Sequence, residues 1–143
     1  MTAWWMVPVV VGLMQPVIWQ TTLRIAKGTG DMEAAITLHL VGTLVGLGWM
    51  GMGMRQGGFS GLGSVPWWAF LGGAIGVSCM AAMNRAIPVI GVAAALALTV
   101  AAQLVAALIF EQFGLLGADF KAASTSRWVG VVLLTLGAWL VVR

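Results

Sequence analysis

Residues 86–110 of the chain read AIPVIGVAAALALTVAAQLVAALIF, and this stretch determines the fold class. It lies between Arg85 and Glu111, carries no charged side chain, and has Gln103 as its one strongly polar residue. A helix of this length is about 37 Å long, whereas the hydrocarbon core of a bilayer is about 30 Å thick. Its apolar residues surround the whole helix, without the polar face of a soluble surface helix. The stretch therefore predicts a membrane-spanning helix.

The composition of the whole chain agrees with a membrane protein. Of its 143 residues, 61% are hydrophobic and 8% are charged, whereas about a quarter of the residues of soluble proteins are charged. A core helix of a soluble protein is the alternative interpretation of residues 86–110, but the remaining sequence is too apolar to surround such a core. We therefore expect a multi-pass protein in a lipid bilayer.

Charge and cysteine content exclude several partners and functions. The net charge of +3 arises from seven Lys and Arg residues scattered along the chain, so no nucleic-acid partner is expected. The single cysteine, Cys79, cannot form an intrachain disulfide and lacks the neighbouring ligands of a metal site, and no motif indicates a cofactor. The sequence shows no catalytic triad and no phosphate-binding glycine loop, so we expect no enzyme.

Apolar segments separated by polar connections predict five membrane-spanning helices in a single all-α domain. These spans cover approximately residues 4–23, 34–54, 67–83, 86–110 and 128–142. The first span is expected to be retained, because no basic residues precede it as they do in a signal peptide. Tryptophans near the span ends are expected to anchor the helices at one membrane surface, namely Trp4, Trp5, Trp67, Trp68 and Trp128.

Two of the connections between spans are expected to be tight. Residues 24–33 predict a polar turn in which Gly28, Gly30 and Asp31 supply the turn residues and a cap for the following helix. The third and fourth spans are expected to join in a tight connection formed by Asn84, Arg85 and Pro88, which makes them antiparallel neighbours. The other two connections are predicted to be hydrophilic loops, at residues 55–66 and 111–127.

Small residues at helical spacing predict where helices approach one another. Close packing, rather than hydrophobicity, holds helices together in lipid, and it favours glycine and alanine at the contact. The second span carries a GxxxG pattern and the fourth a ladder of alanines four residues apart. The predicted packing residues are Gly42, Gly46, Gly72, Gly76, Ala93, Ala97 and Ala101.

Polar and aromatic side chains within the spans predict a small-molecule site. Pro16 is expected to kink the first helix beside two glutamines, and irregular polar backbone is tolerated in a membrane where it lines a cavity. A kink that only serves helix packing is an open alternative. Two tryptophans are candidates for stacking on a flat or cationic ligand, although packing against lipid is their commoner role. The candidate substrate-binding residues are Gln15, Trp19, Gln20, Trp49 and Gln103.

Two titratable residues are candidates for coupling transport to an ion. His39 lies within the second span, and an ionisable residue at membrane depth is a functional candidate by default. Glu111 follows the fourth span. The alternatives are a neutral, hydrogen-bonded histidine near the interface and a solvated glutamate at a helix end.

Positive charge is almost equally divided between the two sides of the membrane. If five spans alternate in direction, three basic residues flank one surface and four flank the other. Balanced flanks allow insertion in both orientations, and an inverted pair of chains is what a half-length transporter needs. The alternative is a single orientation that a partner fixes.

Several short motifs occur in order along the chain. They are Gln15-Pro16, Val41-Gly42-Thr43, Pro66-Trp67-Trp68-Ala69-Phe70-Leu71-Gly72-Gly73, Gly91, Gln103, Glu111-Gln112-Phe113-Gly114-Leu115-Leu116-Gly117, Gly130, Leu133 and Gly137. Their order and spacing resemble the bacterial YdcZ-like family, five-helix members of the drug/metabolite transporter superfamily. The resemblance covers nearly the whole chain, although Trp19 stands where such proteins often have asparagine.

The resemblance implies that the chain is one five-helix repeat of the drug/metabolite transporter type in the bacterial inner membrane. Full-length relatives join two inverted repeats, so this chain is expected to pair with a second five-helix chain, a copy or a paralogue, in antiparallel orientation. The pair would move a small-molecule substrate by alternating access. The alternative function is a non-transporting accessory or scaffold subunit of a larger membrane complex.

Overall fold

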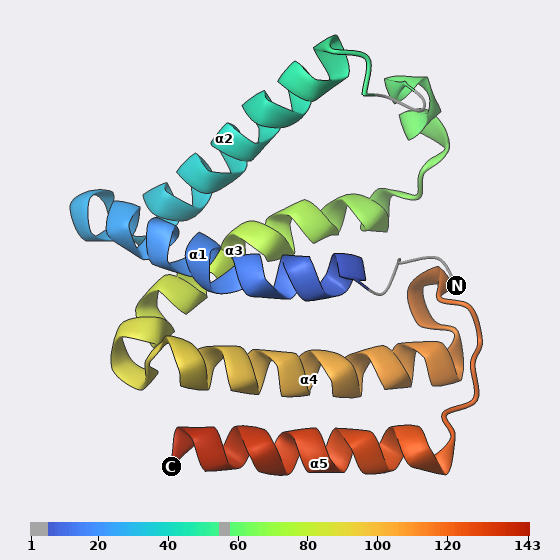
Figure 1. Cartoon of the computed structure of the whole chain (residues 1–143). Coiled ribbons are helices and arrows are strands. Elements are labelled where there is room, and N and C mark those ends of the chain that lie inside the picture. The colour runs from blue at the N-terminus through green and yellow to red at the C-terminus, as the bar shows by residue number, and fades with distance from the viewer. Residues whose placement is uncertain (1–5, 55–57) are drawn as a thin grey trace. The chain divides into compact units, whose positions relative to one another are not determined.

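The computed structural model describes residues 6–54 and 58–143 (Figure 1). The regular structure of these residues is helical throughout, and five of their helices are long and apolar enough to cross a membrane. The helices are α1 (Met6–Thr29), α2 (Asp31–Gly51), α3 (Leu71–Ile90), α4 (Val92–Phe113) and α5 (Thr125–Val142). The predicted all-α membrane fold is therefore confirmed, while the predicted anchors Trp4 and Trp5 lie outside the described residues.

The chain divides into two compact units, which are described separately. The first extends to Arg85 and contains α1, α2 and most of α3, and the second runs from Ala86 to Arg143 and contains α4 and α5. Two short 3-10 helices, η2 (Phe59–Ser64) and η3 (Trp67–Phe70), lie between α2 and α3. The connection predicted as a loop therefore has helical turns over part of its length.

The core of the first unit lies around the junction of α1 and α2. On α1, Trp19 is 4% exposed and Thr22 is fully buried, and on α2 both Ala34 and Ala35 are fully buried. The Thr22 hydroxyl donates to the carbonyl oxygen of Ile18 at 2.7 Å, so its burial leaves no polar group unpaired. The alanines at the start of α2 allow the close approach that packing in lipid requires.

Two contacts at matching positions show that α2 and α3 run antiparallel. Asn84 Nδ2 donates to the main-chain carbonyl oxygen of Asp31 at 3.1 Å. His39 lies later in α2, against Gly76, which lies correspondingly earlier in α3. Figure 1 shows that α2 and α3 diverge from this end toward η2. The two helices therefore meet at the start of α2 and separate toward its end.

Single glycines join α1 to α2 and α3 to α4. Gly30 has φ 112° and ψ 162°, and Gly91 has φ 84° and ψ 156°. This backbone region is accessible almost exclusively to glycine. At both junctions the glycine N–H donates to the carbonyl four residues earlier, and the glycine carbonyl accepts from the amide four residues later, at 2.8–3.1 Å. The glycine N–H therefore closes the last turn of one helix, and the glycine carbonyl accepts the first hydrogen bond of the next.

Both junctions differ from the predicted ones. The first is one residue long, because α1 continues to Thr29, and Asp31 begins α2 without a side-chain cap. The second lies at Gly91 rather than at Asn84 and Pro88, because α3 continues through both residues. Proline holds φ near −65°, so it cannot adopt the positive φ that this turn requires, and the chain reverses at the next glycine.

In the second unit, α4 and α5 pack along a seam that repeats every seven residues. The buried residues of this seam are Ala94, Ala101, Leu108, Val131 and Ala138. A seven-residue spacing keeps one stripe of each helix in contact with the other when the two wind gently around each other. Of the predicted alanine ladder, Ala101 belongs to the seam, whereas Ala97 is half-buried and Ala93 is exposed.

Replacing Gly91 by alanine should lower the free energy of unfolding by about 1–3 kcal/mol, because a Cβ atom strains this backbone conformation. The matched control is Gly130→Ala in α5, where an added Cβ atom meets nothing within 4 Å and the backbone is helical. This control should be neutral or slightly stabilising. Denaturant titration in detergent, followed by circular dichroism, measures both, and equal stability of the two variants would contradict the strain at Gly91.

Candidate functional site

A groove opens in the first unit beside His39. Its volume is about 680 Å³, within the range of about 300–1,000 Å³ that small-molecule sites occupy. Residues His39 and Thr43 are one helical turn apart, so both side chains lie on the same side of α2. The groove is lined by Ile18 from α1, by Leu38, His39, Gly42 and Thr43 from α2, and by Gly76 and Met80 from α3.

The two ring nitrogens of His39 have different surroundings. Nδ1 lies 2.8 Å from the carbonyl oxygen of Ala35. A carbonyl oxygen can only accept a hydrogen bond, so Nδ1 carries the proton in this contact. In the neutral ring, Nε2 is then an acceptor, and a Cβ atom added at Gly76 would lie 3.5 Å from it. The missing side chain at Gly76 therefore leaves the space beside Nε2 free.

Thr43 presents a second acceptor to the groove. Its hydroxyl donates to the main-chain carbonyl oxygen of His39 at 2.8 Å, so the proton is used within α2 while lone pairs of the oxygen remain available. The other lining residues are apolar, and none of the lining residues is an acid, a lysine or an arginine. This arrangement can bind a ligand, and the Thr43 hydroxyl is hydrogen-bonded to the main-chain carbonyl of His39 rather than to its ring.

The predicted substrate-binding residues do not line the His39 groove. On α1, Gln15 is half-buried, Trp19 is buried in the core, and Gln20 is exposed. Trp49 is 55% exposed near the end of α2, and Gln103 is exposed on α4 in the second unit. Their role in substrate binding stays a prediction.

Some residues of the groove were marked by the sequence, but for unrelated reasons. His39 is the ionisable residue of the second span, and Gly42 and Gly76 were predicted to pack helices. Thr43 was marked only as part of the Val41-Gly42-Thr43 motif and not as a candidate site residue, although its position four residues after His39 places it on the same face of α2. The sequence analysis missed the apolar lining residues Ile18, Leu38 and Met80.

Polar contacts fix the end of the groove at which α2 and α3 meet. Arg85 Nε lies 2.8 Å from Asp31 Oδ2, and the Arg85 side chain is 78% exposed. An ion pair this exposed contributes about 0–1 kcal/mol. Asn84 is 3% exposed, and its side-chain amide donates a hydrogen bond to the Asp31 carbonyl oxygen. Loss of this hydrogen bond would leave a buried polar group unpaired.

In the second unit, polar side chains hold the connection between α4 and α5. The carboxylate of Glu111 pairs with the guanidinium of Arg127. The Ala123 N–H donates to Gln112 Oε1 at 2.7 Å, and the Lys121 N–H donates to the main-chain carbonyl of Glu111 at 2.9 Å. Glu111 therefore has a structural partner, and its role in coupling stays a prediction.

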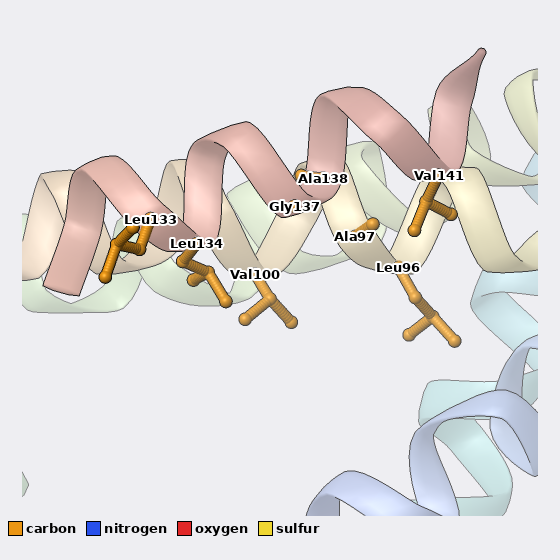
Figure 2. Close-up of a pocket in the computed structure, with 8 residues that line it drawn as sticks. All are labelled: Leu96, Ala97, Val100, Leu133, Leu134, Gly137, Ala138 and Val141. Atoms are coloured by element: carbon orange, nitrogen blue, oxygen red, sulfur yellow. The ribbon is translucent and has the colours of Figure 1, made fainter.

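A second groove, between α4 and α5, has a different chemical character (Figure 2). Its volume is about 470 Å³. No side chain of its lining can form a hydrogen bond, so it suits an apolar helix or a lipid chain better than a polar solute. It is lined by Leu96, Ala97, Val100, Leu133, Leu134, Gly137, Ala138 and Val141. Residues 6–54 and 58–143 contain no cluster of three or more His, Cys, Asp or Glu that could hold a metal.

Comparisons with known proteins place the chain among membrane proteins. The sequence model of a family described as "Putative inner membrane exporter, YdcZ" matches residues 3–140. The "Inner membrane protein YdcZ" of Escherichia coli (strain K12) is 34% identical over 130 residues, which cover 87% of this chain and 85% of that protein. No solved structure shows significant similarity to the chain.

The pairing of Glu111 with Arg127 predicts an energetic coupling between them. In a double-mutant cycle of Glu111→Gln and Arg127→Gln, the coupling energy should be about 0.2–1 kcal/mol, as for a partly exposed ion pair. Asp119→Asn combined with Arg127→Gln is the control, because Asp119 forms no ion pair within the described ranges, and these effects should add. Chemical unfolding in detergent measures all variants, and additive effects for Glu111 would contradict the pairing.

Proposed function

The chain belongs to the YdcZ family of multi-pass bacterial inner membrane proteins, and we propose that it is one subunit of a transporter for a small molecule. The observation that carries this proposal is the His39 groove, which combines a volume suited to a small ligand with two hydrogen-bond acceptors on a membrane-spanning helix. Lipid cannot pair with such acceptors, so polar groups at this depth mark substrate or ion pathways. The family's description as a "Putative inner membrane exporter" supports a transport role.

In this proposal a second five-helix chain, a copy or a paralogue, completes the transporter. In an apolar stretch of 18 residues within each span, 11–22% of the residues are buried against other parts of the chain. A Cβ atom added at Gly46 or Gly72 would meet no atom of the described residues within 4 Å. Small residues serve close helix packing in lipid, so these unoccupied positions favour a partner helix.

The divergence of α2 and α3 supports alternating access between inverted chains. The helices α2 and α3 meet where Asn84 contacts Asp31, and they separate toward η2 (Figure 1). An antiparallel partner would carry the same helix pair with its diverging end toward the opposite membrane surface. Rocking of the two chains against each other would then expose a bound substrate to one surface and then to the other. The balanced positive charge of the flanks favours such an inverted pair.

Purification in mild detergent should yield a protein mass of about 30 kDa, twice the 14.9 kDa of one chain. Native mass spectrometry measures this mass and identifies the second chain as a copy or a paralogue. A lone chain would contradict the proposal. Stable association with a larger unrelated membrane protein would support the accessory-subunit alternative instead.

The orientation of the two chains is measured on the same assembly in sealed vesicles. Cysteine is introduced as Asp119→Cys, in the connection between α4 and α5, on a Cys79→Ser background. A membrane-impermeant maleimide added outside should label about half of the chains of an antiparallel homodimer, because half of the α4–α5 connections face each surface. The control is full labelling after detergent is added, and labelling of all or none in intact vesicles would contradict antiparallel pairing.

The two predicted glutamines are tested separately from the His39 groove, which they do not line. If they contact the substrate elsewhere on its path, Gln15→Ala and Gln103→Leu should each slow transport by roughly two- to tenfold at low substrate concentration, the effect of losing one hydrogen bond of about 0.5–1.5 kcal/mol. A thermal-shift screen first finds the substrate, since a ligand at a hundred times its dissociation constant stabilises by about 2.7 kcal/mol. Uptake into proteoliposomes is then measured. Ser78→Ala is the control, because this hydroxyl bonds to its own helix. Wild-type rates in both variants would remove the two glutamines from the mechanism.

A further inference from the structure

We propose that the His39 groove takes a neutral molecule whose hydrogen-bond donor, such as a hydroxyl or an amide N–H, is attached to an apolar body. The donor binds Nε2 of His39 and Oγ1 of Thr43, and the apolar body lies against the aliphatic lining. This inference rests on the proposed transport function and deepens it, because it assigns a substrate class to the groove. The lining residues that contact the apolar body are Ile18, Leu38 and Met80.

The helix itself selects the tautomer on which this chemistry depends. If Nε2 carried the ring proton, the lone pair of Nδ1 would face the carbonyl oxygen of Ala35 at 2.8 Å, with no proton between the two acceptors. That contact is repulsive, whereas a proton on Nδ1 makes it a hydrogen bond. The Thr43 hydroxyl proton is likewise held by the His39 carbonyl oxygen. The neutral groove therefore offers two acceptors and no side-chain donor.

The charges of the surrounding helices favour a neutral ligand. No charged side chain lines the groove, and the nearest charged positions along the three helices are at least five residues, or about 7 Å, from a lining residue. A cation would lose its hydration without a counter-charge, and an anion would meet two acceptors. The nearest charged residues along these helices all lie toward the junction of α1 and α2, namely Arg24, Asp31, Glu33 and Arg85.

Gly76 keeps Nε2 accessible to a ligand. A Cβ atom at this position would be in ordinary van der Waals contact with Nε2, at 3.5 Å. The additional atoms of a leucine would fill the space that a ligand donor needs. Gly73 provides the matched control, because it lies on the same helix, does not line the groove, and an added Cβ atom there meets nothing within 4 Å.

The experiment observes the site directly, because His39 is the single histidine of the chain. The full chain, labelled with ¹⁵N-histidine, is studied by NMR in lipid bilayers at about pH 8, above the range in which imidazole ordinarily titrates. It is titrated separately with benzyl alcohol, benzyl methyl ether and benzoate. The alcohol and the ether share an apolar body, but the alcohol alone donates a hydrogen bond, and benzoate tests an anion.

The expected spectrum has the proton on Nδ1, and benzyl alcohol shifts the Nε2 resonance upfield in a saturable way. The ether and benzoate leave this resonance unchanged. Gly76→Leu abolishes the shift, and Gly73→Leu retains it. A proton on Nε2, no saturable shift with the alcohol, or an equal response to the ether or benzoate overturns the proposal.

Transport is measured on the same preparation, so the two proposals fail separately. A chain that transports a substrate in proteoliposomes but lacks the Nε2 response keeps the transporter function and loses this substrate class. A chain with the full Nε2 response and no transport of any compound that stabilises it supports the binding chemistry and overturns the transport function.

Discussion

A lipid bilayer offers no hydrogen-bond partner, and this constraint accounts for most polar contacts within the spans. Threonine hydroxyls donate to a carbonyl of the preceding turn, as those of Thr22, Thr43 and Thr135 do. No buried side-chain nitrogen or oxygen lacks a partner in the part of the chain that the structure describes. His39 is different, because its own helix satisfies one ring nitrogen and leaves the other to whatever enters the groove. Nε2 is therefore the ring nitrogen that a donor group of a ligand can reach.

The same constraint explains the single-residue junctions. A longer turn at Gly30 or Gly91 would interrupt the helical hydrogen bonds and place unpaired backbone groups at the membrane boundary. The positive φ of glycine instead redirects the chain within one residue, and the N–H and carbonyl of that glycine stay paired. The short junction at Gly30 also places Asp31 at the first residue of α2, where it meets the end of α3. Gly30 therefore determines the position of the residue through which α2 contacts α3.

The sequence predicted the number and order of the spans, because a long uncharged run has one stable conformation in lipid. It placed the end of the third span at residue 83, because proline usually ends a helix, whereas α3 includes Pro88 and continues to Ile90. The turn follows at Gly91, because proline cannot adopt the positive φ that this turn requires. His39 and Gly76 could each be marked, but their meeting depends on the antiparallel register of α2 and α3, which no local pattern contains. The partner of Glu111 was missed for the same reason, because Arg127 lies beyond a long connection.

Glycine in a membrane span has two uses, and the surroundings of its missing Cβ atom distinguish them. Where another helix fills that space, the glycine serves packing. At Gly76 the neighbouring atom is a polar ring nitrogen, whereas at Gly42, Gly46 and Gly72 an added Cβ atom meets no described atom within 4 Å. Gly42 and Gly76 line the His39 groove, and an added Cβ atom at Gly46 or Gly72 meets no described atom within 4 Å, so these glycines form no closed helix contact within the part of the chain that the structure describes. A sequence motif for helix packing therefore also describes a binding groove, and which use applies depends on the angle between the helices.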